Sequence, residues 1–207
     1  KVLILGGRGM LGTDLVSVFK DKAKVTAWDK EDIDVTQEAE VISKILPLEP
    51  NLIINATGYT NVDGAEDDKL MAFKLNSDAV KNLVSTAKKI GAKIFHFSTE
   101  YVFDGANQSG YDESAVVNPL NVYGQSKAAG EKYVINYTNG YLIRSSWLYG
   151  HAPQRGKPRG LNFIDTVIKL SQEQPQVKIV NDQFGKPTAT KDLAQATYNL
   201  WRGKNQP

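Results

Sequence analysis

The chain opens with a strand pattern that runs directly into a glycine-rich turn and a helix pattern. Residues 1–5 (Lys-Val-Leu-Ile-Leu) form a short apolar run, and glycines follow with G-x-x-G-x-x-G spacing at Gly6, Gly9 and Gly12. Apolar residues then recur at helical spacing, at Leu11, Leu15, Val16 and Phe19. In such a unit, backbone N–H groups and the helix N-terminus can bind a pyrophosphate. A plain tight turn is the alternative, but the position between a buried strand and an amphipathic helix favours a dinucleotide site.

Strand and helix patterns alternate along the rest of the chain. Strands are expected at residues 2–5, 25–28, 52–55, 93–98, 141–145 and 177–180, and helices at about residues 11–20, 37–46, 70–90, 123–137, 162–173 and 190–201. This alternation predicts an α/β fold, a doubly wound parallel sheet of the Rossmann type with helices on both faces. Ligands of such sheets bind at the carboxyl ends of the strands, here at the switch point beside the first strand.

The composition of the chain excludes several classes of binding partner. The 207 residues suit one domain, or one domain and part of another, and the formal net charge of +2 is too small to indicate a nucleic acid or an anionic membrane. No apolar stretch approaches the ~18 residues of a membrane span. There is no cysteine, and the two histidines, His96 and His151, lack the spacing of metal ligands. We therefore expect a cytoplasmic protein with no metal site and no nucleic-acid or membrane partner.

Tyr123 and Lys127 form a Tyr-x-x-x-Lys pattern inside an expected helix. Residues four apart lie on one helical face, so the phenol and the ammonium point into the same space. A free tyrosine has a pKa of about 10, and a neighbouring cation favours the phenolate and lowers that pKa. The pattern alone is also typical of a solvated helix face, so interpreting it as a proton-delivery pair depends on its surroundings.

A pair of hydroxyl groups stands at the end of an expected strand. The apolar run at residues 95–97 leads into Ser98 and Thr99. Both fall at the carboxyl end of their strand, where ligands of doubly wound sheets bind. The stretch from Thr99 to Tyr123 is long enough for a loop and the start of the next helix. A hydroxyl, a phenol and an ammonium that converge near a nicotinamide would make a carbonyl reduction site.

Longer blocks of sequence resemble one family. They are residues 55–66 (Asn-Ala-Thr-Gly-Tyr-Thr-Asn-Val-Asp-Gly-Ala-Glu), 98–105 (Ser-Thr-Glu-Tyr-Val-Phe-Asp-Gly), 119–131 (Pro-Leu-Asn-Val-Tyr-Gly-Gln-Ser-Lys-Ala-Ala-Gly-Glu), 144–150 (Arg-Ser-Ser-Trp-Leu-Tyr-Gly), 162–163 and 182–188. In this order, over almost the whole chain, they resemble the dTDP-4-dehydrorhamnose reductase family of the extended short-chain dehydrogenase/reductase superfamily. Several blocks are shared with close relatives of different activity. Glu100 departs from the family, which usually carries Asp after Ser-Thr, and this change is conservative.

The resemblance implies NAD(P)H-dependent reduction of dTDP-4-dehydro-β-L-rhamnose to dTDP-L-rhamnose. Tyr123 then donates the proton to the oxygen of the substrate ketone, and Thr99 donates a hydrogen bond to that oxygen. Lys127 holds the cofactor ribose and shifts the protonation equilibrium of Tyr123. The residues implied to bind the sugar are Thr99, Glu100, Tyr101, Trp147 and Asn162. A core aromatic at a strand end is the alternative role for Trp147.

The glycine turn and the resemblance together predict a cofactor-binding set: Gly6, Arg8, Gly9, Met10, Leu11, Gly12, Asp29, Asp34, Val35, Ala56, Thr57, Gly58, Tyr59, Thr60, Tyr123 and Lys127. Asp29, near the end of the second strand, favours NADH, because an acid there accepts hydrogen bonds from the ribose and disfavours a 2′-phosphate. Arg8 favours NADPH, because a guanidinium can bind that phosphate bidentately, and Lys30 adds a second cation. We predict that NADPH is preferred and that NADH is tolerated. Asp34 could instead accompany a helix N-cap at Thr36.

Residues 151–160 read as a loop with two prolines, two glycines and several cations. Its position after Trp147 makes it a candidate lid over the diphosphate of a nucleotide sugar, bound by Arg155, Lys157 and Arg159, although a solvated connection is equally compatible. We expect residues 1–150 to form the NAD(P)-binding Rossmann domain with the Tyr-x-x-x-Lys site. Residues 151–207 are expected to hold the last Rossmann elements, interleaved with part of an incomplete small substrate domain, because family members continue beyond Pro207.

Other functions stay open at this point. The chain could reduce or epimerise another nucleotide sugar, or serve as a non-catalytic regulatory subunit like the beta subunit of methionine adenosyltransferase, which resembles the same family. It could also be a cofactor-binding fragment without turnover. The intact Thr99, Tyr123 and Lys127 favour an enzyme whose partner is a nucleotide-sugar substrate, and the sequence is compatible with a homodimer.

Overall fold

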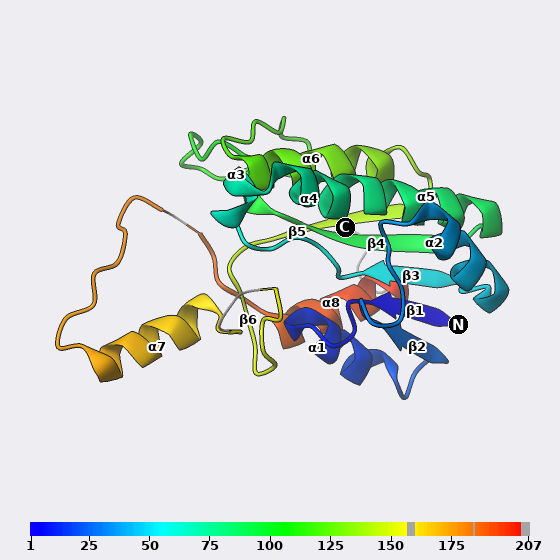
Figure 1. The fold of residues 1–207 in the computed structure, drawn as a ribbon, viewed down its shortest axis with the longest axis horizontal. Coiled ribbons are helices and arrows are strands. Elements are labelled where there is room, and N and C mark those ends of the chain that lie inside the picture. The colour runs from blue at the N-terminus through cyan, green and yellow to red at the C-terminus, as the bar shows by residue number, and fades with distance from the viewer. Residues whose placement is uncertain (157–159, 184, 204–207) are drawn as a thin grey trace.

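The computed structural model describes residues 1–156, 160–183 and 185–203. At its centre is a five-stranded, all-parallel sheet with the order β2-β1-β3-β4-β5 (Figure 1). The strands are β1 (Val2–Leu5), β2 (Val25–Trp28), β3 (Leu52–Asn55), β4 (Lys93–Thr99) and β5 (Gly140–Ser145). The chain moves outward from β1 to β2 and then crosses back to β3 on the other side of β1. This reversal is the switch point of a doubly wound sheet, so the expected fold class is confirmed.

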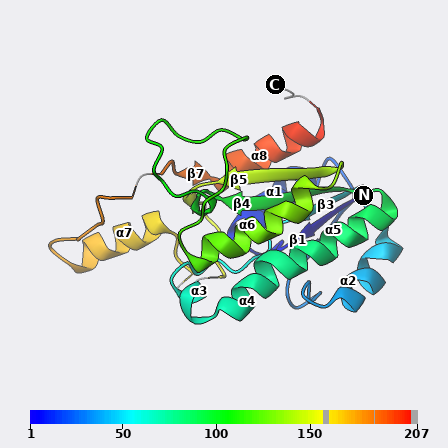
Figure 2. The same cartoon turned by 90° about the horizontal axis from the view of Figure 1, so that it is seen from above.

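Helices cover both faces of the sheet (Figures 1 and 2). One layer holds α1 (Met10–Phe19) and α8 (Thr190–Trp201), and the other holds α2 (Glu38–Ile45), α5 (Ala79–Ile90) and α6 (Val122–Ile135). The strand β1 is buried along its whole length, because alternate side chains enter opposite layers. Val2 and Ile4 pack in the layer of α1, while Leu3 and Leu5 pack in that of α5.

The segment between β3 and β4 is helical but interrupted. It consists of α3 (Gly64–Asp67), α4 (Lys69–Phe73), a π-helical turn (Lys74–Asp78) and α5, where one helix over residues 70–90 was expected. The π turn carries Asn76 inward, where its amide donates to Tyr59 O at 3.2 Å and to Ser126 Oγ at 2.9 Å, and accepts from Tyr59 N at 2.9 Å. A π turn often marks a functional site, and this one joins the loop after β3 to α6.

The C-terminal part departs from the sequence-based expectation. The strand expected at residues 177–180 is wrong: this segment has no regular structure, and Ile179 and Val180 are 53% and 61% exposed. A strand needs a neighbour that pairs with its backbone, and none lies beside this segment among the described residues. Instead, β6 (Leu148–Tyr149) and β7 (Thr188–Ala189) form a short parallel pair. The helix α7 (Phe163–Glu173) buries no residue and projects from the body (Figures 1 and 2).

Within residues 1–156, 160–183 and 185–203, no helix is long and apolar enough to span a membrane. Nor do three or more histidine, cysteine, aspartate or glutamate side chains gather there in a way that could hold a metal ion.

Candidate active site

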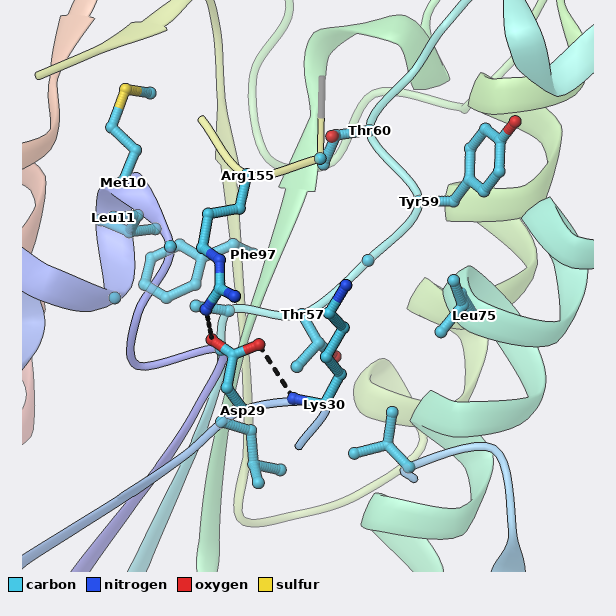
Figure 3. A pocket seen from close by; sticks show the side chains of 18 of the residues that line it. Met10, Leu11, Asp29, Lys30, Thr57, Tyr59, Thr60, Leu75, Phe97 and Arg155 are labelled. Atoms are coloured by element: carbon cyan, nitrogen blue, oxygen red, sulfur yellow. Dashed lines mark hydrogen bonds and ion pairs between the residues drawn. The ribbon is translucent and has the colours of Figure 1, made fainter. Parts of the chain in front are cut away.

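A cavity of about 580 Å³ opens at the carboxyl ends of β1, β3 and β4, next to the switch point (Figure 3). Of the residues expected to bind the cofactor, only Arg8 does not line this cavity. The others do: Gly6, Gly9, Met10, Leu11, Gly12, Asp29, Asp34, Val35, Ala56, Thr57, Gly58, Tyr59, Thr60, Tyr123 and Lys127. Their role in binding stays a prediction, but the fold brings them to one place. Lining residues that the sequence reasoning did not assign to the cofactor site include Trp28, Ile33, Leu75, Phe97, Ser98, Ser145, Leu148, Gln154, Arg155 and Gly156.

The glycine turn has no room for side chains. A Cβ on Gly12 would lie 1.9 Å from Gly6 O, and Gly6 itself has φ +78°, which favours glycine. The amides of Gly6 and Gly7 both donate to Trp28 O, at 2.8 and 3.1 Å, so the turn is tied to the end of β2. Gly9 is the N-cap of α1 and offers no side chain to cap it. The helix N-terminus therefore faces the cavity as bare backbone, which suits a pyrophosphate.

Asp29 lies at the β2 end of the cavity. Its carboxylate accepts hydrogen bonds from Lys30 N at 2.9 Å and Arg8 N at 3.1 Å, and Arg155 Nη1 lies 3.7 Å away (Figure 3). The guanidinium of Arg8 does not line the cavity and instead pairs with Glu31 at 3.1 Å and Asp32 at 3.2 Å. The backbone of Arg8 thus supports Asp29, while its side chain is bound by Glu31 and Asp32.

Asp34 forms a local turn at the cavity wall. Its Oδ1 accepts from Thr36 N at 2.9 Å and from Thr36 Oγ1 at 2.7 Å, and these bonds lower the pKa of its carboxyl group. The alternative in which Thr36 caps a helix is wrong, because α2 has Gln37 at its N-cap, without a side-chain hydrogen bond. Asp34 is therefore part of the wall and not a helix cap.

Lys127 is buried beneath the cavity. It is 5% exposed, and its Nζ donates to Phe97 O at 2.6 Å. Burial lowers the pKa of Lys127 to about 8, while the Glu131 carboxylate acts in the opposite direction. A Cβ on Gly58 would come within 3.8 Å of Nζ, so the ammonium lies directly under the loop after β3.

Tyr123 lies beside Tyr101, with ring centroids 5.6 Å apart in an edge-to-face arrangement. Burial raises the pKa of Tyr123 and the Glu100 carboxylate raises it further, whereas the neighbouring Thr99 side chain acts in the opposite direction and only partly offsets these effects. The expected lowering of this pKa by Lys127 is therefore wrong. The ammonium is directed at the carbonyl of Phe97, and desolvation of the phenolate outweighs any nearby positive charge. The phenol keeps its proton at neutral pH.

Thr99 is held by its neighbours at the end of β4. Its Oγ1 donates to Glu100 Oε2 at 2.9 Å and accepts from Tyr101 N at 3.2 Å. Burial raises the pKa of Glu100, and the hydrogen bond from the Thr99 hydroxyl only partly offsets this effect. Trp147 has φ +46°, an uncommon conformation for a residue with a side chain, so the structure imposes local strain at this edge of the site.

Asn162 is 3% exposed, caps α7 by accepting from Asp165 N at 3.0 Å, and donates to Gly150 O at 3.3 Å. Its contact with the sugar stays a prediction. His96 is fully buried in the core with Asn55 Nδ2 at 3.0 Å from its Nδ1. Of the three cations in the expected lid, Arg155 is described, whereas Lys157 and Arg159 lie outside the described residues.

The family described as the RmlD substrate binding domain matches residues 1–207. The chain belongs to this family. Its sequence is 36% identical to a dTDP-4-dehydrorhamnose reductase from Aggregatibacter actinomycetemcomitans, over 97% of this chain and 67% of the relative. It is also 36% identical to a dTDP-4-keto-6-deoxy-D-glucose reductase from Streptomyces niveus, over 97% of this chain and 68% of the relative. The chain thus spans about two thirds of these relatives, and the resemblance inferred from the sequence is confirmed.

Solved structures agree with this family. A dTDP-4-dehydrorhamnose reductase from Clostridium acetobutylicum superposes with a TM-score of 0.91 at 36% identity, covering 100% of this chain and 71% of its own. One from Bacillus anthracis, solved in complex with NADP, gives a TM-score of 0.90 at 34% identity, with 100% and 72% covered. A UDP-glucose 4-epimerase from Brucella ovis shares the fold with a TM-score of 0.79 at 14% identity, covering 98% of this chain and 74% of its own.

Proposed function

We propose that the protein is an NADPH-dependent reductase that converts dTDP-4-dehydro-β-L-rhamnose into dTDP-L-rhamnose. The observation that carries this proposal is one cavity lined by the glycine turn, Tyr123 and Lys127, with Thr99 held beside the phenol. Membership of the family and relatives named dTDP-4-dehydrorhamnose reductase support the choice of substrate. The structure of a relative in complex with NADP supports the choice of coenzyme.

The residues of the cavity fit a nicotinamide dinucleotide. The bare glycine turn would hold the pyrophosphate, Asp34 and Val35 the adenine, and residues 56–60 with Lys127 the nicotinamide ribose. Ser98 lines the cavity, and its buried Oγ has no hydrogen-bond partner among the described residues. When bound, the reduced nicotinamide supplies the hydride.

Tyr123 would deliver the proton to the oxygen of the substrate ketone. Its raised pKa keeps the phenol protonated at neutral pH, which suits a general acid. Thr99 is prepared to orient the same oxygen, but its hydroxyl proton is bound to Glu100 in this structure. To donate a hydrogen bond to the substrate, the Thr99 hydroxyl must release the Glu100 carboxylate and take the ketone oxygen as its acceptor. Glu100 therefore fixes the hydroxyl until substrate arrives.

The division of the chain into domains is also a proposal. We assign residues 1–150 to the dinucleotide-binding domain and residues 151–207 to its last elements together with part of the substrate domain. Two observations support this: α8 packs on α1 and completes one helical layer, whereas α7 projects away from the sheet (Figure 1).

The pH dependence of kcat/KM should reflect the charge of the Lys127 side chain. Because its pKa is lowered to about 8, the ammonium is present below that pH and lost above it. We expect kcat/KM for ketone reduction to fall as the pH rises through about 8, measured between about pH 6 and 10. In a Lys127→Arg variant the side chain stays charged, so the decline should move to higher pH. A flat profile in the unsubstituted protein would contradict this role for Lys127.

The function itself is tested by NADPH oxidation with a panel of 4-keto sugars carrying dTDP, GDP or UDP. We expect consumption of dTDP-4-dehydro-β-L-rhamnose and formation of dTDP-L-rhamnose. The name of the Streptomyces niveus relative favours a second candidate, reduction of dTDP-4-keto-6-deoxy-D-glucose, which the same panel separates. NADPH binding without oxidation by any sugar would instead indicate a regulatory, non-catalytic role.

A further inference from the structure

Arg155 reaches from the loop after β6 across the mouth of the cavity to the end of β2 (Figure 3). Its Nη2 donates to Glu31 Oε1 at 2.9 Å, and these two residues are 124 positions apart in the sequence. The loop is also packed on the opposite side of the cavity, because a Cβ on Gly156 would lie 2.2 Å from Thr60 Oγ1. The loop therefore bridges the cavity, with Arg155 bound at the end of β2 and Gly156 packed against Thr60 on the other side.

Glu31 is shared between two guanidinium groups. Arg155 binds one of its carboxylate oxygens at 2.9 Å, and Arg8 binds the other at 3.1 Å. Two guanidiniums that converge on one anion are also the arrangement that binds phosphate, because their N–H groups match phosphate and carboxylate oxygens alike. The Glu31 side chain is 43% exposed, so its carboxylate can turn into water. The two guanidinium groups thus form an anion site, and the Glu31 carboxylate that occupies it can be displaced.

This anion site lies where NADPH and NADH differ. Asp29 and Lys30 line the cavity at the end of β2, which in doubly wound folds is the position of the adenosine ribose. The two coenzymes differ only in the 2′-phosphate on that ribose. Asp29, Glu31 and Asp32 place three carboxylates here, and they would repel the phosphate unless cations were turned toward it.

We propose that Arg155, together with Arg8, binds the 2′-phosphate of NADPH in place of the Glu31 carboxylate, and that Arg155 thereby determines the coenzyme preference. The inference rests on the proposed function, because it requires a nicotinamide dinucleotide in the cavity. It gives Arg155 a different ligand from the sugar diphosphate that the sequence suggested. Glu31 is the competitor of the phosphate, and it keeps both arginines in place while no phosphate is bound.

The test compares dissociation constants for ligands with and without the 2′-phosphate. NADPH and NADH are titrated by nicotinamide fluorescence, and adenosine 2′,5′-bisphosphate and 5′-AMP by calorimetry, at one fixed salt concentration. Arg155→Ala should raise the dissociation constants of the two 2′-phosphorylated ligands about tenfold, and those of NADH and 5′-AMP less than about twofold. Glu31→Gln should act in the opposite direction and lower the dissociation constant of NADPH about threefold.

Arg202→Ala is the matched control, because it removes the same charge from an exposed position just after α8. All four dissociation constants should stay within about twofold in this variant. Equal weakening of NADPH and NADH by Arg155→Ala would overturn the proposal, since Arg155 would then bind a part that both coenzymes share. Unchanged NADPH affinity would overturn it as well. If the unsubstituted chain bound neither coenzyme, the proposed function would fail first and the phosphate site with it.

Discussion

Replacing Tyr123 with phenylalanine is expected to lower turnover by about a hundredfold or more, with NADPH affinity changed less than about twofold. The substitution removes one hydroxyl group and keeps the ring, so the edge-to-face contact with Tyr101 is preserved. Because burial raises the pKa of the phenol, the hydroxyl carries its proton at neutral pH. Without it, the developing alkoxide has no side-chain acid at that position.

Tyr133→Phe is the matched control for this experiment. Tyr133 lies on the same helix, is partly buried and packs against the core. It should keep turnover within about twofold, because an isosteric change outside the site leaves the chemistry untouched. Single-turnover and steady-state rates measured with dTDP-4-dehydro-β-L-rhamnose decide the question. A folded Tyr123→Phe protein with unchanged turnover would falsify the assignment of Tyr123 as the acid.

The second large effect is on stability, at the pair formed by Glu131 and Arg144. Glu131 is 2% exposed, and its carboxylate accepts two hydrogen bonds from Arg144, at 3.0 and 2.7 Å. Glu131→Ala leaves the guanidinium without its partner, so we expect the free energy of unfolding to fall by about 3 kcal/mol. This is near the lower end for a buried pair, because the Arg144 side chain is 19% exposed and also lies over the ring of Phe103. Urea unfolding measures the change.

Glu113→Ala provides the comparison, since Glu113 lies in an exposed loop and should change the free energy of unfolding by less than about 0.5 kcal/mol. Equal stability of the Glu131 and Glu113 variants would contradict the prediction. The Glu131 variant has a second readout, because this carboxylate raises the pKa of Lys127 against the effect of burial. Its loss should move the alkaline decline of kcat/KM to lower pH, in a protein that is still folded at the assay temperature.

Local patterns in the sequence were sufficient for the elements that hold the cofactor cavity. The first strand, the glycine turn and α1 follow from apolar runs and from turns that only glycine can make, because both depend on residues close together in the chain. The ends of β3 and β4 were predicted for the same reason, and parallel strands place their carboxyl ends at one edge of the sheet. The strand expected at residues 177–180 failed because periodicity cannot show whether a partner strand is present.

Electrostatics and long-range pairing depend on tertiary structure. The spacing of Tyr123 and Lys127 predicted a lowered pKa for the phenol, but burial raises this pKa. The ammonium of Lys127 donates to Phe97 O. Desolvation is a sum over everything that surrounds a group, so no short pattern contains it. The same holds for Arg155 and Glu31, which are 124 positions apart and meet only because the loop after β6 crosses the cavity. The sequence by itself determined which groups stand at the strand ends, and the packing of distant segments decided their protonation and their partners.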